Sequence, residues 1–551
     1  MADTPRFTAL GKLVSIVLVA GLVTLGVYMI RDRGLGPINL PGVGSDGDGD
    51  TEIQEVQVEI PTLSPPGTFQ FTDNIVPIEI SEYAGYAGLI AANGGLEPTE
   101  NSMFFKNHGF KVRLTVSEDE NWSELNEGTI AASVTTVDVL AAYGRQLHAV
   151  VPAQIAFSRG ADGVVVRSEI KRINQLKGQT LATAQFTEVD FFIRYLAQEA
   201  GLPVHALGSL DAAPHPDRLN LVYTEDGFGA GDLFLRELTA NRKRLAGAVT
   251  WEPKVSEVVE GSGGQAHVLT TNRNLLIVAD VLVVHRGFAE QHPNVVRGLV
   301  QGLLEGNRQM RERPDQHLDT VARAFKWSRE DARAEIANVH FSNLPENLAF
   351  FSGAIDAAGS FSGIYQSAVL AYGRELIKDP PDASRFADTS ALQAIQAAGL
   401  FKDQIVAIAP IRTAGGGTIE TDPLLSKDIR FLFEPNSATL DQANRENLEN
   451  LEAIRRLLQV SPGSTLLLRG HVDNALVDEF RKTGGEAFVR SQALRAMELS
   501  KNRAAEIRTL LIDRHKIDPK RVDTVGRGWE EPAGPESDQN RRVEVQWFTV
   551  E

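Results

Sequence analysis

The feature that most constrains this sequence is an uncharged apolar run near its N-terminus, Leu13–Ile30. Lys12 precedes the run, and Arg31 and Arg33 follow it. A helix rises about 1.5 Å per residue, so the run spans roughly 27 Å, close to the hydrocarbon thickness of a bilayer. It ends in bulky residues and not in a small-residue cleavage site, which favours a membrane anchor over a cleaved signal peptide. We expect one transmembrane helix here, after a cytoplasmic tail at residues 1–12.

Net charge and cysteine content exclude several classes of function. The formal net charge is −17, and the 551 residues include no cysteine. Nucleic-acid binding needs clustered Lys and Arg, which so acidic a chain does not favour. Without cysteine there are no disulfides, thiolate metal sites, iron–sulfur clusters or cysteine nucleophiles. The histidines show no spacing typical of a metal site, so neither a metal nor a cofactor is expected.

The chain is too long for one hydrophobic core, and its composition marks the joints between domains. Residues 31–69 are rich in Pro, Gly and Asp, and residues 401–427 include three consecutive glycines. Such segments cannot bury a core and are typical of linkers. They separate a larger domain at 70–400 from a smaller one at 428–551.

The two domains differ in the order of their predicted elements. In the larger one, apolar runs such as Val76–Ile80 and Val112–Val116 alternate with amphipathic runs such as Pro293–Glu312. This alternation predicts an α/β domain with a mostly parallel sheet. Residues 428–551 follow the order strand, helix, strand, long helix, strand and strand, which predicts a compact α+β domain.

Four motifs of the smaller domain occur in an order known from one family. They are the opening strand Ile429–Phe433, the sequence Gly-His-Val-Asp-Asn at 470–474, Leu-Ser-Lys-Asn-Arg-Ala at 499–504, and Asn-Arg-Arg-Val at 540–543. Together they resemble the OmpA-like peptidoglycan-binding domain over nearly its whole length. The resemblance implies a non-catalytic domain that grips the cell wall.

The same resemblance assigns roles to five residues. Asp473 is expected to bind the ammonium of diaminopimelate in peptidoglycan, and Arg503 its carboxylate. A guanidinium can hold a carboxylate through two parallel hydrogen bonds. Asn474 and Leu499 are expected to line the pocket, and Arg542 to support it. The alternative is that Asp473 and Arg503 form only a surface salt bridge.

One segment departs from the family pattern. Residues 475–495 add material that most members lack, so that Asp473 and Arg503 lie 30 residues apart. Ala496 stands where the family carries an asparagine. The added segment can form a lid over the pocket, lengthen a helix, or displace the arginine.

The larger domain resembles the two-lobed periplasmic solute-binding proteins of the sulfonate, nitrate and thiamine-precursor group. The matching segments are Ile80–Tyr86, Gly128–Asp138, Ser158–Val166, Leu176–Ala182 and Ala248–Pro253. The resemblance implies two α/β lobes that close on a solute at the carboxyl ends of sheet strands. Some relatives are thiamine-pyrimidine synthases that rely on a cysteine-rich motif, which this chain lacks.

Seven residues fall at predicted strand ends and are expected to line that cleft: Tyr83, Tyr86, Thr135, Thr136, Ser158, Thr187 and Trp251. Hydroxyls and backbone N–H groups suit an anion or a small polar solute, and aromatic rings suit stacking. The alternative for the three aromatic residues is ordinary core packing.

We therefore expect a protein of the bacterial inner membrane, with a single span and most of its chain in the periplasm. It is expected to bind peptidoglycan and a small polar or anionic solute, and not to be an enzyme, since no nucleophile and base occur together in a known motif. The alternative is a structural or docking protein between membrane and wall, an accessory of a membrane complex whose larger domain binds no solute.

Overall fold

The computed structural model describes residues 53–117, 121–353, 359–408, 424–433, 437–461 and 463–548. The expected membrane helix at 13–30 and the tail before it lie outside these residues. Among the helices that are described, none is both long and apolar enough to cross a membrane.

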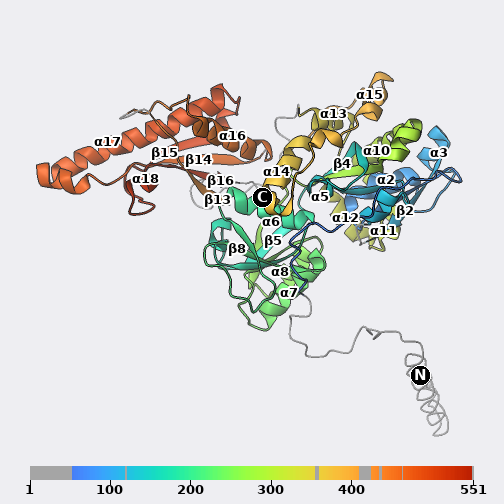
Figure 1. Cartoon of the computed structure of the whole chain (residues 1–551), viewed down its shortest axis with the longest axis horizontal. Coiled ribbons are helices and arrows are strands. Elements are labelled where there is room, and N and C mark those ends of the chain that lie inside the picture. Colours follow the sequence, from blue (N-terminus) through green and yellow to red (C-terminus); the bar gives the residue numbers. More distant parts are fainter. Residues whose placement is uncertain are drawn as a thin grey trace, which may run out of the picture. The chain divides into compact units, whose positions relative to one another are not determined.

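The larger domain has two lobes, each built on its own sheet (Figure 1). Lobe I has the strand order β12-β4-β11-β3-β1-β2. Its strands are β1 (Ile75–Ile80), β2 (Lys111–Val116), β3 (Ala132–Thr136), β4 (Ala149–Ser158), β11 (Ala279–His285) and β12 (Val339–Phe341). Its helices are α2 (Ala87–Asn93), α3 (Met103–His108), α4 (Trp122–Glu127), α5 (Val137–Tyr143), α9 (Arg286–Gln291), α10 (Pro293–Glu312), α11 (Leu318–Phe325), α12 (Arg329–Ala337), α13 (Leu344–Ser352), α14 (Phe361–Leu376) and α15 (Ser390–Ala397).

Lobe II repeats this plan with the strand order β10-β5-β9-β6-β8-β7. Its strands are β5 (Asp162–Arg167), β6 (Thr180–Ala184), β7 (Val204–Ala206), β8 (Leu219–Thr224), β9 (Gly247–Trp251) and β10 (Ala266–Thr271). Its helices are α6 (Glu188–Glu199), α7 (Gly227–Thr239) and α8 (Lys254–Gly261). The expected two-lobed α/β architecture is therefore confirmed.

The expectation of a mostly parallel sheet holds for lobe II, where three of the five described strand pairs are parallel, and is wrong for lobe I, where only two of five are. In lobe I, β1 runs parallel to β2 and β3, but β11 is antiparallel to both β3 and β4. In lobe II, β6 is parallel to β8 and β9, while β5 is antiparallel to β9 and β10. The antiparallel pairings come from strands at the crossings between lobes: β11 runs against β3 and β4, and β5 runs against β9 and β10.

The lobes are joined where β4 leads into β5 and where β10 leads into β11. Asn272 fastens these two crossings together. Its Oδ1 accepts a hydrogen bond from Gly160 N at 2.7 Å, and its Nδ2 donates to Ser158 Oγ at 2.8 Å. Helix α14 packs against both α5 and α6, so it braces the two lobes as well (Figure 1). The hinge is thus a short, hydrogen-bonded pair of strands.

A buried ion pair fixes the wall of lobe II that faces lobe I. Arg194 Nε lies 2.7 Å from Asp190 Oδ1, and the two side chains are 7% and 0% exposed. Arg194 also donates to the hydroxyl of Tyr223 at 2.6 Å. The second carboxylate oxygen of Asp190 accepts from Phe186 N at 3.2 Å, which holds a residue with a positive φ of 63°. The pair therefore shapes the turn between β6 and α6.

Helices α2 and α10 approach so closely that glycine is required at their crossing. A Cβ atom on Gly306 would lie 2.0 Å from the carbonyl oxygen of Gly88. Beside it, Asn307 Nδ2 donates to the carbonyls of Ile155 (2.8 Å) and Ser342 (2.9 Å). The contact thus joins α10 to both α2 and the central strand β4.

Replacing Gly306 with alanine is expected to lower the free energy of unfolding of lobe I by about 1–3 kcal/mol. Alanine gains up to about 1 kcal/mol in helix propensity. The clash is with backbone, which cannot rotate away, so overpacking outweighs this gain. Hydrogen exchange of amides in α2 and α10 measures the effect. Gly208→Ala is the control, since a Cβ there meets nothing within 4 Å; equal protection in both variants would contradict the prediction.

The segment 53–69, which composition assigns to a linker, is bound to both lobes. On lobe II, Gln57 N donates to Gln185 Oε1 at 2.9 Å, and Gln185 Nε2 donates back to Gln57 O at 2.8 Å. On lobe I, Gln146 Nε2 donates to Pro61 O at 2.9 Å. The expected linker is therefore too long at its C-terminal end, because amide side chains of the lobes satisfy its backbone groups.

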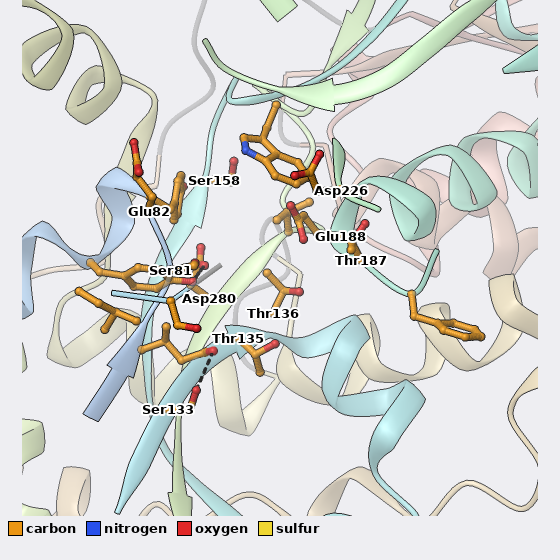
Figure 2. A pocket seen from close by; sticks show the side chains of 18 of the residues that line it. Ser81, Glu82, Ser133, Thr135, Thr136, Ser158, Thr187, Glu188, Asp226 and Asp280 are labelled. Atoms are coloured by element: carbon orange, nitrogen blue, oxygen red, sulfur yellow. Dashed lines mark hydrogen bonds between the residues drawn. The ribbon is translucent and has the colours of Figure 1, made fainter. Parts of the chain in front are cut away.

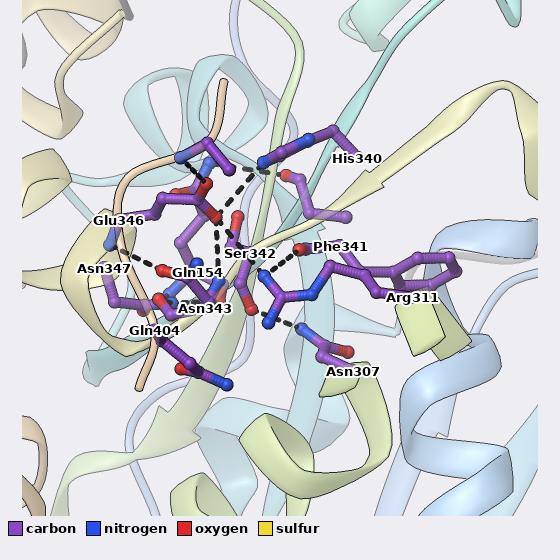
Figure 3. A network of polar contacts seen from close by, with 12 residues as sticks. Gln154, Asn307, Arg311, His340, Phe341, Ser342, Asn343, Glu346, Asn347 and Gln404 are labelled. Carbon is purple, nitrogen blue, oxygen red and sulfur yellow. Dashed lines mark hydrogen bonds and ion pairs between the residues drawn. The ribbon is translucent and has the colours of Figure 1, made fainter. Parts of the chain in front are cut away.

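The start of the second expected linker is also fixed, by a polar network around the buried carboxylate of Glu346 (Figure 3). Ala407 N donates to Glu346 Oε1 at 2.9 Å, and Asn343 N donates to Glu346 Oε2, also at 2.9 Å. Asn343 Nδ2 donates to Ile405 O at 2.7 Å. Residues 404–407 therefore belong to lobe I.

The C-terminal domain is a four-stranded sheet of order β13-β16-β14-β15. Its elements are β13 (Leu425–Ile429), α16 (Arg445–Gln459), β14 (Thr465–Gly470), α17 (Val477–Asp513), β15 (Val522–Gly526), α18 (Ser537–Asn540) and β16 (Val543–Phe548). The opening strand was expected at Ile429–Phe433 and lies four residues earlier. Leu425 pairs with Trp547, the largest fully buried side chain, so pairing with β16 sets its position.

The added segment 475–495 lengthens α17 at its N-terminal end. The helix is interrupted at Gly484 and Gly485, where φ is 65° at the second glycine. Most side chains before the interruption are exposed. Of the three expectations for this segment, a longer helix describes it.

Candidate functional sites

The first candidate site, the C-terminal pocket, is a cavity of about 430 Å³ at one end of the small sheet. It brings together residues that follow β13 and β14, residues of α17, and residues that precede β16. Four of the five expected residues line it: Asp473, Leu499, Arg503 and Arg542. Asn474 does not line it, although it is next to Asp473 in sequence.

Arg503 reaches the pocket from α17 and is held by two neighbours. Its Nε donates to the carbonyl of Ser437 at 3.2 Å, and its guanidinium carbon lies 4.8 Å from the ring centroid of Phe433. Burial lowers the pKa of Arg503, and the charge of Arg541 adds to this effect while that of Asp473 opposes it. An anion beside Arg503 would offset both the cost of burying the positive charge of Arg503 and the repulsion from Arg541.

Asp473 does not pair with Arg503 in the described part of the chain. Its Oδ1 accepts from Ala475 N at 3.1 Å, and its Oδ2 lies 3.8 Å from Arg541 Nε. The two residues expected to bind ligand therefore line the same cavity without contacting each other across it. A direct surface salt bridge between them is not what the structure shows.

Two further arginines, Arg430 and Arg541, line the C-terminal pocket and were not expected. Together with Arg503 and Arg542 they set four guanidinium groups against the carboxylate of Asp473. Arg542 is partly neutralised, since its Nε donates to Asp428 Oδ1 at 2.9 Å. The excess positive charge suits a ligand with several carboxylates. Arg541 could have been found from the sequence, because it lies inside the Asn-Arg-Arg-Val motif.

A cluster behind this pocket has the spacing of a metal site but is already neutralised. Ligand atoms of His471, Glu531 and Glu544 lie within 4.8 Å of one another. Arg469 pairs with Glu544 at 2.6 Å and with Glu531 at 2.7 Å. Burial acts to raise the pKa of Glu544, but the nearby imidazole of His471, a hydrogen bond from Gln546 and the charge of Arg469 lower it to about 2. The cluster stabilises the sheet, and a metal ion would have to displace a guanidinium.

The second candidate site, the interlobe cleft, is a cavity of about 480 Å³ between lobes I and II. All seven expected residues line it: Tyr83, Tyr86, Thr135, Thr136, Ser158, Thr187 and Trp251. They come from the strand ends that face the hinge and from the turns that follow. Strand ends therefore point into the crevice, as the chain's α/β pattern implies.

The aromatic residues of the cleft pack against neighbouring rings and also line the cavity. Tyr83 and Tyr86 meet edge to face, with ring centroids 5.5 Å apart. The Tyr86 hydroxyl donates to Asp280 Oδ1 at 2.9 Å. On the other lobe, Trp251 packs against Phe228, with ring centroids 5.3 Å apart. Their rings are thus preorganised.

Four buried polar atoms in the cleft have no hydrogen-bond partner in the described part of the chain. They are the hydroxyl oxygens of Tyr83, Thr135 and Thr136 and the second carboxylate oxygen of Asp280. Thr135, Thr136 and Asp280 are 5%, 7% and 2% exposed. Buried polar groups are nearly always paired, so these atoms are suited to a ligand or to water.

The sequence did not single out the carboxylates of the cleft. Seven line it: Glu79, Glu82, Asp162, Glu188, Glu225, Asp226 and Asp280. Figure 2 shows Glu82 and Asp280 on the side of lobe I, and Glu188 and Asp226 on the side of lobe II. Among the lining residues that the structure describes there is no Lys, Arg or His.

Two of these carboxylates are deeply buried beside the hinge. Burial raises the pKa of Asp280 well above its ordinary value, and the charges of Asp162 and Asp138 raise it further. Burial also raises the pKa of Asp162 to about 6, although hydrogen bonds from Ser158 and Asn272 oppose this. Both carboxyl groups are costly to ionise while no cation lies beside them.

A comparison with known protein families identifies the C-terminal domain. Residues 432–546 match the model of the OmpA family. No curated protein sequence matches the chain significantly. One similar solved structure is the periplasmic aliphatic sulphonate binding protein of Escherichia coli, with 16% identity and a TM-score of 0.42 over 56% of this chain and 96% of that one.

A putative sulfonate-binding protein of Methylobacillus flagellatus KT gives 14% identity and a TM-score of 0.43, over 61% of this chain and 96% of that one. The nitrate-binding protein of Synechocystis PCC 6803 gives 14% and 0.41, over 62% and 91%. Such identities say nothing of the ligand of the present chain. The expected OmpA-like domain is confirmed by the match at residues 432–546, and the two-lobed α/β architecture of the larger domain is shown by its own two sheets.

Proposed function

We propose that this chain is a non-catalytic envelope protein that binds peptidoglycan through its C-terminal pocket and a small solute in its interlobe cleft. The observation that carries the first part is the meeting of Asp473 and Arg503 at one cavity, despite the 21 added residues at 475–495 between them. In this proposal Asp473 takes the ammonium of diaminopimelate, and Arg503 takes its carboxylate. Arg541 and Arg430 are placed to bind further carboxylates of the stem peptide.

The solute-binding part is supported by the state of the cleft. A docking domain without a ligand would be expected to fill the space between its lobes with packed side chains. Here the cleft keeps a cavity of about 480 Å³ with buried polar atoms that lack partners. The hydrogen-bonded hinge at Asn272 allows such a cleft to close on a solute. The apolar run at 13–30 would hold the protein in the inner membrane, with both sites in the periplasm.

The wall-binding part predicts selectivity for the residue at the third position of the stem peptide. Residues 52–551 form one compact unit and can be used without the N-terminal segment. We expect this unit to co-sediment with sacculi that contain diaminopimelate and to remain in solution with sacculi that contain lysine there. Lysine lacks the side-chain carboxylate that Arg503 is proposed to bind. Equal binding to both would exclude the diaminopimelate clamp, and binding to neither would exclude the wall anchor.

A further inference from the structure

We propose that the solute of the interlobe cleft carries a positive charge and an apolar or aromatic body, as an organic ammonium ion does. This rests on the proposed solute-binding role and changes its expected ligand. From the hydroxyl groups expected in the cleft, the sequence predicts a small polar or anionic solute. The lining found in the structure holds seven carboxylates and, among the described residues, no cationic side chain.

Electrostatics decides against an anion in this cavity. Water is largely excluded near the hinge, so charges there interact more strongly than at the surface. An anion would meet like charges with no Lys, Arg or His among the described lining residues to offset them. It could lie beside Asp280 only while that carboxyl stays protonated. A cation reverses each of these effects.

Asp280 is the group best placed to hold the cation. It is 2% exposed, and one of its carboxylate oxygens is already fixed by the Tyr86 hydroxyl at 2.9 Å. The other oxygen has no partner in the described part of the chain and belongs to the lining of the cavity. An ammonium N–H can donate to that oxygen, and the neighbouring hydroxyl oxygens of Thr135 and Thr136 can accept further N–H groups.

The rings of the cleft favour an organic cation over a metal ion. Among the described residues, the cleft contributes no group of three ligand atoms close enough to hold one ion. Trp251 and Tyr83 instead present aromatic surface on opposite lobes. A cation attracted to ring faces, with an apolar body packed beside them, matches this lining.

Binding of such a cation is expected to release protons. The charged and titratable groups around Asp280 are Asp138, Asp162, Tyr83 and Tyr86, and none of them is cationic. Burial and these neighbours favour the protonated carboxyl while the cleft is empty. A cation favours the ionised form, so its affinity should rise with pH as Asp162 and Asp280 become easier to ionise.

The test uses 2-phenylethylamine as a cationic probe and 2-phenylethanol as its neutral counterpart. Phenylacetate and methanesulfonate serve as anionic probes. Calorimetric titration of the 52–551 unit at pH 7.5 should show the amine binding about tenfold or more tightly than the alcohol, with no binding of either anion. Between pH 7.5 and pH 5.5 the affinity for the amine should fall, while that for the alcohol should not change.

The matched variants are Asp280→Asn and Asp403→Asn. Asparagine keeps the shape of a protonated Asp280 and can still accept from Tyr86, so the fold should be retained, which thermal unfolding checks. The preference for the amine over the alcohol should fall about tenfold in Asp280→Asn. Asp403 is exposed on lobe I, so Asp403→Asn makes the same substitution away from the cleft and should leave the preference intact.

Each outcome separates the cation preference from solute binding itself. Binding of an anion, or equal binding of amine and alcohol, would overturn the charge preference and leave a solute-binding cleft. No binding by any probe would overturn both. An amine preference that survives in Asp280→Asn would overturn the assignment of Asp280.

Discussion

Replacing Arg503 with alanine is expected to weaken binding of the 52–551 unit to diaminopimelate-type sacculi about ten- to a hundredfold. A hydrogen bond to a charged group contributes about 1.5–3 kcal/mol, and a guanidinium can supply two to one carboxylate. The half-buried position of Arg503, which lowers its pKa, leaves little water to replace the lost partner. Co-sedimentation at a series of sacculus concentrations gives the apparent affinity.

Two variants on the same helix make this prediction specific. Arg503→Lys keeps the charge but loses the planar pair of donors, so it should recover only part of the binding. Arg490→Ala removes an exposed arginine of α17 outside the pocket and should bind as the unchanged protein does. If Arg503→Ala co-sediments with sacculi as well as the unchanged protein does, the C-terminal pocket is not the peptidoglycan-binding site.

Replacing Arg194 with methionine is expected to lower the free energy of unfolding of lobe II by about 3–5 kcal/mol. The change leaves the carboxylate of Asp190 buried without its cation, and it removes the partner of the Tyr223 hydroxyl. Burial already raises the pKa of Asp190, despite Arg194, so the carboxyl should become protonated in this variant. Hydrogen exchange of amides in β6 and β8 measures the loss locally.

A buried pair and a surface pair should respond very differently. Arg329 pairs with Asp319 at the surface, where the side chains are 45% and 65% exposed. Arg329→Met should therefore cost only about 0–1 kcal/mol. The double variant Asp190→Leu, Arg194→Met should be more stable than Arg194→Met alone, because it removes the buried carboxyl group that has lost its partner. Equal losses for Arg194→Met and Arg329→Met would show that burial does not set the cost.

The outline of the cleft could be predicted from the sequence because strand ends face the crevice in such folds. Thr135 and Thr136 end β3, Ser158 ends β4 and Trp251 ends β9, and all four line the cavity. The pattern of apolar residues predicts where a strand lies, and the end of that strand predicts which residues reach the edge of the sheet that faces the cleft. No further knowledge of distant contacts is needed.

The carboxylates could not be predicted in this way, because each has an ordinary local explanation. Asp226 is the N-cap of α7, and Glu188 stands in the first turn of α6, where acidic residues are common. Asp280 lies inside a buried strand and meets Asp162 only because two distant crossings lie side by side. Their convergence depends on tertiary structure, which also changes the expected charge of the solute.

Composition was similarly unable to place the ends of the linkers. It misses that Phe69 is buried in the core of lobe I and that Val56 and Leu63 pack against the core. Backbone groups of such segments can also be bound by polar side chains far away in sequence. Gln185 and Gln146 do this for the first segment, and Glu346 does it for residue Ala407. None of these partners has a local pattern that predicts the contact.

The segment at 53–69 has a mechanical consequence. It is hydrogen-bonded to lobe II at Gln57 and to lobe I at Pro61, so it bridges the two lobes across the hinge. Rotation of one lobe against the other changes the distance that this segment must span. Tension on the chain ahead of residue 53 reaches the hydrogen bond of Gln54 to Tyr223 first, then those of Gln57, and then that of Pro61. Pulling on the N-terminal end and closing the cleft therefore load the same few bonds, so force on the tether and occupancy of the cleft are expected to influence each other.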